Sequence, residues 1–422
     1  MRIALVARSS NPLAPHTDPG SRAEAARVSS LGQALAGLGH RVTIYDRRDS
    51  AGLPDSVIIA PGITVEHVTA GPSEPLDADQ LAPHLPEFGH YLAQRWRRNP
   101  PVIAHAHHWT AGLAALAGAR DLGVPVAQTF GSLGAAEQRY GLAESLSDTR
   151  LRLEACIARN ADVVLASSAE ELADLARLGV AKVRAKMVPC GVDAQQFSPE
   201  GPAAERSERP RLLAAQPLTA TRSLGLALRV LAEIPEAELV IIGGPRQAKL
   251  GKDQDYREIL RLARKLNVHD RLVCTGRVAP DDLPALLRSA DLLVSTAPYE
   301  PVGMTALQAM ACGTPVVAAA AGAEQDAVVD KTTGLILPPG PPAQLALRVR
   351  RLLANSLRLE AYGIAATDRA RSRYSWERIG RETLAAYGRC SPRAAAAARA
   401  RSAQPDHAGT RVAVRVSAGA HA

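Results

Sequence analysis

The chain has 422 residues, of which 46% are apolar and 22% are charged. This size exceeds what one hydrophobic core usually supports, so we expect two domains of about 150 to 200 residues each, and the composition excludes a disordered chain. Aromatic residues make up only 3%, so alanine, leucine and valine must fill most of the core.

The net charge of +8 is unevenly distributed, since residues 391–422 hold five arginines and one aspartate. This Ala/Arg-rich segment therefore carries half of the excess, and its lack of large apolar groups predicts a disordered tail. No aromatic residue is interleaved with its arginines, so nucleic-acid binding is not favoured. The tail is compatible with weak peripheral contact with a membrane.

The five cysteines are far apart and form no CxxC pair; they are Cys156, Cys190, Cys274, Cys312 and Cys390. The spacing favours neither a disulfide framework nor a zinc site and fits a reducing cytosol. The N-terminal stretch MRIALVARSS has five apolar residues before Arg8, too few for the core of a signal peptide. We therefore expect a first buried strand and a cytoplasmic protein.

Short apolar strands alternate with amphipathic helices in the first half, as in βα units around a parallel sheet. The expected strands are RIALVA, RVTIYD, VIAHAH, VPVAQTF and ADVVLASS. The expected helices are Arg22 to Leu38, Glu87 to Arg98 and Ser168 to Leu178. Residues 1–190 are thus predicted to form a doubly wound, Rossmann-like domain.

The same pattern restarts after a segment rich in proline, glycine and charge, which predicts a linker at residues 191–209. Its strands are RLLAAQ, AELVIIG, RLVCTG, ADLLVST and TPVVAAA, with helices at Ser223 to Glu233 and Tyr256 to Leu266. We expect a second Rossmann-like domain at 210–373 and a helix at 374–390 that returns to the first domain. Ligands of such folds bind beyond the carboxyl ends of the strands, so the cleft between the domains is the predicted site.

The uncharged run from Pro301 to Ala323 is long enough to cross a bilayer. Prolines and glycines divide it into loop, helix, turn and strand, so we favour burial in a globular sheet.

The segment YEPVGMTALQAMACGTPVV combines an acid with the start of a helix. The backbone N–H groups of Gly303, Met304 and Thr305 are predicted to be free at the positive helix end, as in a phosphate site. Glu300 would lie beside the phosphate and accept hydrogen bonds from sugar hydroxyls. Gln308 follows one turn later on the same side. The alternative is that this is an ordinary strand–loop–helix junction that binds nothing.

EPVGMTALQAMACGTPVVA, followed by TTGLILPP, resembles the signature of the retaining GT-B glycosyltransferases of family four. The resemblance extends to HAHHWTAGLAA, ARNADVVLASSAEE, VPCGVDAQQFSP and GRVAPDDLPALLRSADLLVST, and so covers roughly residues 1–390. The chain is most similar to actinobacterial transferases that act on small polyols or lipid-linked acceptors. The resemblance implies a GT-B fold, with an acceptor domain first and a nucleotide-sugar domain second.

By this resemblance Glu300 holds the donor sugar, residues 303–305 hold the diphosphate, and Gln308 contacts the ribose in place of the usual glutamate. Arg222 stands near a cationic position that binds the leaving diphosphate, whereas Pro217 stands where a second cation is usual. In VIIGGP, Gly243 and Gly244 resemble the nucleotide-contacting turn.

In the first domain, Gly131 occupies the place of a histidine that reaches the reacting centre. His107 and His108 are acceptor-side candidates to replace it, although packed histidines are the commoner case. The first βα loop resembles a loop with two glycines, of which only Gly20 remains, followed by Ser21.

No metal-binding motif is visible, and neither metal nor cofactor is expected, with a nucleotide sugar as co-substrate. Two hypotheses stand: a working retaining hexosyltransferase with a hydroxyl-bearing acceptor, or a degenerate relative that binds a nucleotide sugar or a partner transferase without turnover. The sugar, base, acceptor and oligomeric state are left open.

Overall fold

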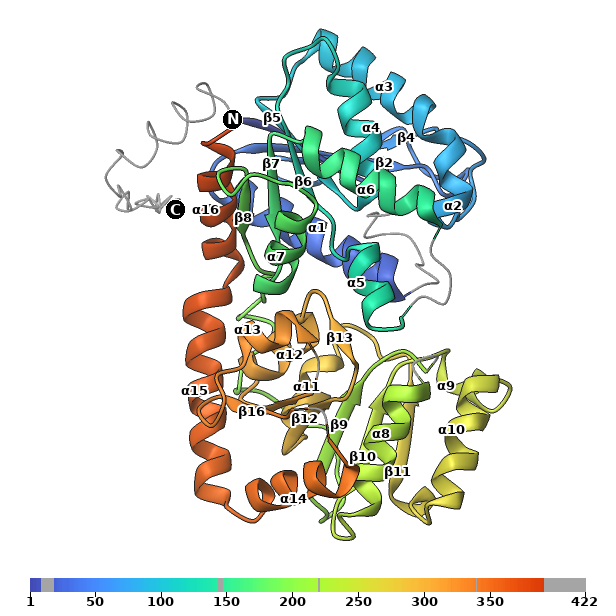
Figure 1. Cartoon of the computed structure of the whole chain (residues 1–422), viewed down its shortest axis with the longest axis vertical. Coiled ribbons are helices and arrows are strands. Elements are labelled where there is room, and N and C mark those ends of the chain that lie inside the picture. The colour runs from blue at the N-terminus through green and yellow to red at the C-terminus, as the bar shows by residue number, and fades with distance from the viewer. Residues whose placement is uncertain (9–18, 143–146, 219–220, 320, 339, 391–422) are drawn as a thin grey trace, which may run out of the picture.

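Two α/β units, each built on a parallel sheet, make up the computed structural model (Figure 1). The structure describes residues 1–8, 19–142, 147–218, 221–319, 321–338 and 340–390. Residues 9–18, for which the sequence predicts donor contacts, lie outside these ranges. Residues 391–422, which are predicted to be a disordered tail, also lie outside them.

The sheet of the first unit has the strand order β3-β4-β2-β1-β5-β6-β7-β8. Its strands are β1 (Arg2–Ala7), β2 (Arg41–Arg47), β3 (Ser56–Ala60), β4 (Ile63–Val68), β5 (Ile103–His107), β6 (Val126–Thr129), β7 (Val163–Ala166) and β8 (Ala185–Met187). All neighbours pair in parallel except β3 and β4. The order reverses between β1 and β5, which register as Ile3 with Ile103, so loops that follow these strands meet at a switch point.

The helices of the first unit are α1 (Pro19–Gly37), α2 (Ala78–Leu81), α3 (Leu85–Arg98), α4 (Trp109–Ala119), α5 (Gly134–Arg139), α6 (Asp148–Asn160) and α7 (Ala169–Arg177), with a 3-10 turn η1 (Ala82–His84). Glycines let α3 and α4 pack closely, because a Cβ at Gly118 would lie 2.6 Å from the Cβ of Leu92. Helix α7 begins where the hydroxyl of Ser168 accepts the N–H of Glu171, a typical N-cap.

The second unit repeats the architecture with the order β11-β10-β9-β12-β14-β16. Its strands are β9 (Arg211–Ala215), β10 (Glu238–Ile242), β11 (Leu272–Gly276), β12 (Leu292–Ser295), β14 (Val316–Ala318) and β16 (Gly334–Ile336). A separate pair, β13 (Tyr299–Glu300) and β15 (Ala321–Gly322), lies beyond the sheet. The switch point falls between β9 and β12.

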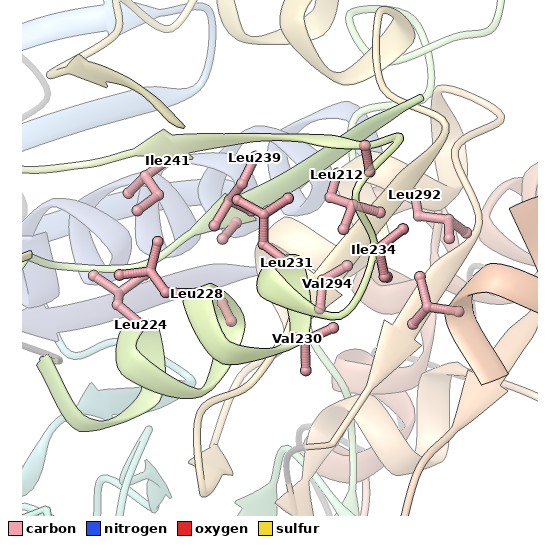
Figure 2. Packing of buried hydrophobic residues seen from close by; sticks show 14 of the residues in the cluster. Leu212, Leu224, Leu228, Val230, Leu231, Ile234, Leu239, Ile241, Leu292 and Val294 are labelled. Carbon is pink, nitrogen blue, oxygen red and sulfur yellow. The ribbon is translucent and has the colours of Figure 1, made fainter. Parts of the chain in front are cut away.

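Aliphatic side chains fill the core of the second unit, as the low aromatic content requires. Figure 2 shows Leu224, Leu228 and Leu231 of α8 (Thr221–Ala232) packed against Leu212 of β9 and Leu239 of β10. The other helices are α9 (Gln247–Leu250), α10 (Gln254–Lys265), α11 (Leu283–Arg288), α12 (Met304–Ala311), α13 (Ala323–Ala327) and α14 (Pro342–Leu353), with a 3-10 turn η2 (His269–Arg271).

Two C-terminal helices, α15 (Ser356–Tyr374) and α16 (Trp376–Tyr387), run along both units (Figure 1). Helix α15 packs on α12, since the hydroxyl of Thr367 donates to the carbonyl of Met310. Helix α16 packs on α1 of the first unit, and the Tyr387 hydroxyl lies 2.8 Å from Nδ1 of His105. The helix predicted over 374–390 is therefore shorter, because Ser375 is extended (φ −60°, ψ 140°) and separates α15 from α16.

The strands predicted from the sequence all occur, with ends shifted by at most two residues. Six strands were not predicted: β3, β4, β8, β13, β15 and β16. The uncharged run after Pro301 forms α12 and β14, whose residues are largely buried. Over the described part of the chain, no helix combines the length and the apolar character that crossing a membrane requires.

Candidate functional site

The candidate site centres on the start of α12, directly after β13. Oε1 of Glu300 accepts hydrogen bonds from the N–H groups of Val302 (3.3 Å) and Gly303 (3.1 Å). The expectation that the Gly303 amide is free is therefore wrong, because the glutamate side chain folds back onto its own loop. The amides of Met304 and Thr305 have no acceptor among the described residues and remain at the positive end of the helix.

Two glycines allow this tight arrangement. Gly303 is the N-cap of α12 in the left-handed region (φ 69°), where a side chain is strained. Gly322 has φ 94°, and a Cβ there would lie 2.4 Å from the carbonyl oxygen of Glu300. Strands β13 and β15 can therefore pair, with Glu300 opposite Gly322, and bring the start of α13 beside α12.

Burial acts on the half-buried Glu300 more strongly than its hydrogen bonds do. Burial raises the pKa of its carboxyl, while the amides of Gly303 and Val302 lower it. Gln308 is half-buried one turn into α12, and its side-chain amide has no hydrogen-bond partner in the described part of the chain. Its oxygen and its amide N–H groups are both available to a ligand on the side of Met304.

Glu324, in the first turn of α13, is a site residue that the sequence analysis missed. It is 3% exposed, and its Oε2 has no hydrogen-bond partner. Burial and the neighbouring Glu300 raise the pKa of Glu324 to about 8, and a hydrogen bond from Ser295 opposes them. The signal available in the sequence was its place shortly after a predicted strand, at the edge where ligands of such sheets bind.

The loop after β9 lies beside that after β12. The hydroxyl of Ser223 donates to Oε1 of Gln216 at 2.6 Å, and its carbonyl accepts from the hydroxyl of Thr296 at 2.8 Å. These bonds hold the first turn of α8, which includes the backbone of Arg222, near the segment that leads to Glu300. The side chain of Arg222 lies outside what the structure describes. Pro217 is exposed shortly after β9. Because proline carries no charge, this position supplies no cation.

Gly243 and Gly244 form the turn after β10, with φ of 146° and 93°. A Cβ at Gly243 would lie 2.3 Å from the carbonyl oxygen of Gln216, and one at Gly244 would lie 2.4 Å from Cδ1 of Leu218. The fold itself therefore requires glycine at both positions. Because β9 and β10 are neighbours, the turn joins the same edge as Glu300, but contact with a nucleotide stays a prediction.

The two histidines proposed on the acceptor side have different roles in the fold. His107 ends β5, is 2% exposed and has no partner for Nε2; burial, then His105 and Arg27, lowers its pKa well below the usual range. It lines a space of about 10 Å³, which holds about one water molecule. His108 is the N-cap of α4 and accepts the N–H of Thr110, so it stabilises a helix start.

The remaining first-unit candidates lie at other loop ends. Gly131 follows β6 with φ 78°, and a Cβ built there meets no described atom within 4 Å, so space is open where a side chain was expected. Gly20 and Ser21 were expected in the loop before α1. They instead lie in its first turn, since the helix begins at Pro19, a residue suited to that position.

Arg27 of α1 is a second residue that the sequence analysis missed. It is 9% exposed and donates to the hydroxyl of Ser167 after β7, yet no described carboxylate lies within ion-pair distance of it. The pKa of the buried Cys190 thiol is raised to about 11, because burial raises it most and Glu300 adds to the rise, while the charge of Arg27 lowers it. The pKa of Cys190 is therefore influenced by Arg27 of the first unit and by Glu300 of the second.

The two units touch directly beside β13. The rings of Tyr140 and Tyr299 stack with centroids 5.0 Å apart and planes at 2°. The N–H of Ala169, at the start of α7, donates to Oδ2 of Asp326 at 2.7 Å. These contacts place the first unit against the residue that precedes Glu300. In the described ranges, no group of three or more His, Cys, Asp or Glu residues is arranged to hold a metal ion.

Two family models match the chain. Residues 25–196 match the glycosyltransferase family 4 model, and residues 202–369 match the model for glycosyl transferases group 1. Among curated proteins, the D-inositol 3-phosphate glycosyltransferase of Kribbella flavida is 31% identical over 92% of this chain and 95% of its own length. A second such enzyme, from Catenulispora acidiphila, is 29% identical with the same coverage of both chains.

Solved structures share the two-unit fold. Sucrose-phosphate synthase of Thermosynechococcus elongatus superposes with a TM-score of 0.80 and 26% identity, over 92% of this chain and 98% of the other. HepE of Anabaena, solved in complex with UDP-glucose, gives a TM-score of 0.67 and 20% identity over 91% of this chain and 99% of the other. At that identity the second likeness concerns the fold alone.

Proposed function

Because this chain belongs to the GT-B glycosyltransferases, which move a sugar from a nucleotide-sugar donor to an acceptor, we propose that it transfers a hexose with retention of configuration to a small polyol phosphate. The acceptor class rests on the curated relatives, which are D-inositol 3-phosphate glycosyltransferases. The observation that carries the donor side is the oriented carboxylate of Glu300 beside the unpaired amides of Met304 and Thr305.

In the proposed complex the diphosphate lies at the start of α12, where the amides of Met304 and Thr305 donate to its oxygens. Oε1 of Glu300 is already engaged by two amides, so its other oxygen is left to accept hydroxyls of the sugar. Gln308 faces the ribose. Arg222, in the first turn of α8, is the cation that we assign to the leaving diphosphate.

The acceptor enters from the first unit, beside Gly131, where the structure leaves room at the end of β6. Its hydroxyl attacks the anomeric carbon on the face from which the diphosphate departs, so no protein nucleophile is needed. The proton of this hydroxyl passes to an oxygen of the leaving diphosphate. Amides and Arg222 stabilise the charge that develops there, a contribution of about 100-fold to 1000-fold per donor.

The test is release of nucleoside diphosphate from a panel of UDP-glucose, UDP-N-acetylglucosamine and GDP-mannose, with D-inositol 3-phosphate, free inositol and glycerol as acceptors. We expect release with one donor that depends on the phosphorylated polyol, and an unchanged anomeric configuration by NMR. Arg222→Ala is expected to reduce release by about 100-fold. Release that is unaffected by Arg222→Ala would contradict the diphosphate assignment.

We also propose that transfer needs no metal ion, since helix amides and an arginine carry the diphosphate charge. Release is expected to persist in EDTA, and a loss that Mg²⁺ or Mn²⁺ restores would overturn this point. We place the reaction in the cytosol, because all five cysteines are free.

A second candidate, a protein that binds a nucleotide sugar without turnover, is favoured by the exposed Pro217 at a position where a cation is usual. It predicts a thermal shift with UDP or UDP-glucose and no release with any acceptor. The panel above separates the two functions.

A further inference from the structure

Two carboxyl groups meet beside the start of α12, although only one is needed to hold a sugar. Glu300 ends β13, and Glu324 lies two residues after Gly322, the residue paired with Glu300. Helices α12 and α13 are in contact. The two carboxyls also interact electrostatically, because burial raises the pKa of Glu324 and the charge of Glu300 raises it further.

No cation among the described side chains is paired with Glu324. Within the described residues it forms no ion pair, and its Oε2 is buried without a partner. An ionised carboxylate in such a place is costly, so a buried acid keeps its proton instead. Two close carboxyls that cannot both ionise share one proton, and their apparent pKa values belong to the pair.

The elements packed around the pair do not supply a counter-charge to Glu324. Helix α12 has no ionisable side chain. Helix α13 itself carries Asp326, which accepts the N–H of Ala169. Arg369 of α15 donates to the carbonyls of Asp326 and Ala327. The other ionisable groups on the elements packed against the pair are Glu170, Glu171, Asp174 and Arg177 of α7 and Tyr299 of β13, and the thiol of Cys190 is close enough for Glu300 to affect its pKa. Arg222 of α8 is the cation whose side chain the structure does not describe.

We propose that Glu324 is a donor-binding residue: Glu300 and Glu324 hold one proton between them and recognise one hydroxyl of the donor sugar, which donates to the Glu300 carboxylate and accepts from the Glu324 carboxyl group. This inference rests on the proposed function. A neutral carboxyl group donates one hydrogen bond and an ionised one only accepts. The pair therefore selects a hydroxyl that does both, and recognition is lost once both carboxyls are ionised.

The first test uses the protein alone. Infrared titration of the carboxyl C=O stretch is expected to show a protonated carboxyl at pH 7 that disappears near pH 8 in the wild type and is missing in Glu324→Gln. The matched control is Glu238→Gln, which removes another buried glutamate, one that is paired with Arg211 in the same unit, and keeps the signal. No protonated carboxyl at pH 7 in the wild type, or the same signal in Glu324→Gln, would overturn the shared proton.

The second test follows release of nucleoside diphosphate against pH with the active donor of the panel. In the wild type, kcat/KM is expected to fall about tenfold per pH unit above the apparent pKa of the pair. In Glu324→Gln, whose amide still donates, this decline should vanish, while Glu324→Leu should lose activity at every pH. Thermal unfolding confirms that each variant is folded.

Each failure has a different signature. An alkaline decline that is identical in wild type and Glu324→Gln rejects the role of Glu324 while leaving the transferase intact. Absence of release from the wild type at any pH rejects the proposed function, and with it the recognition of a sugar hydroxyl, but leaves the infrared result on the shared proton standing.

Discussion

The carboxyl edges of the two sheets differ in which polar groups are left without a partner among the described residues. At the first edge these are side-chain atoms, including Oγ of Ser132 and Nε1 of Trp109. At the first edge, His105 contacts Tyr387 and Thr129, His108 caps α4, and the free nitrogen of His107 faces room for about one water molecule. At the second edge, the amides that open α12 and an oxygen of Glu324 have no partner among the described residues.

His105 and His108 at the first edge maintain the fold, whereas the amides that open α12 are available to a ligand. Unpaired buried polar groups cost free energy, so they persist where binding satisfies them. In the proposed function the second unit supplies a donor site made largely of backbone, whereas the first contributes open space at Gly131 and the buried charge of Arg27. The acceptor side therefore depends more on how the units meet.

The largest effect is expected at Glu300. Replacement by glutamine in Glu300→Gln removes the charged acceptor and should lower kcat/KM for nucleoside diphosphate release by about 100-fold or more. The same chemical change in Glu66→Gln, at a carboxylate paired with Arg95 in the first unit, should alter it by less than about threefold. An equal loss of kcat/KM in both variants would contradict a special role of Glu300 at the second edge.

A gain is expected from Gln308→Glu. Hydrogen bonds to a charged acceptor are stronger than neutral ones, and about 1 kcal/mol of extra binding corresponds to about fivefold tighter binding of UDP. Isothermal calorimetry measures this change, with Gln308→Leu expected to weaken binding. Weaker binding by the glutamate variant would show that Gln308 does not face a ribose hydroxyl.

The contact between the units is tested at Tyr140. Tyr140→Ala removes the stack on Tyr299, which is worth about 1 kcal/mol, and should lower kcat/KM by about threefold, because β13 loses its support from the first unit. Tyr140→Phe keeps the stack and loses only the hydrogen bond to Glu170, so it should retain activity. Activity that does not change in the alanine variant would mean that this contact is separate from catalysis.

The smallest effect on activity is expected at Tyr387. Tyr387→Phe leaves Nδ1 of the buried His105 without its partner, which should lower the free energy of unfolding by about 1 kcal/mol. Denaturant titration measures the loss. Release of nucleoside diphosphate should stay at the wild-type level, and a large drop would instead link α16 to the acceptor side.

Local sequence patterns were enough for much of the fold and part of the site. Apolar runs of four to seven residues predicted the central strands, since buried parallel strands are apolar on both faces. Short strands such as β8 and β16 were not predicted, because three residues give no usable pattern. The glycine and the apolar run after it predicted the position of α12. They did not predict that the side chain of Glu300 accepts a hydrogen bond from the Gly303 amide.

The amino-acid sequence by itself determined which segments form alternating strands and helices, and that a helix begins shortly after Glu300. Both features depend on neighbours within a few residues. Only the tertiary structure decided that Glu324 lies close to Glu300 with no ion-pair partner among the described residues, that Tyr140 stacks on Tyr299, and that His105 meets a tyrosine 282 positions away. Such partners are chosen by packing between distant elements, and no local pattern specifies them.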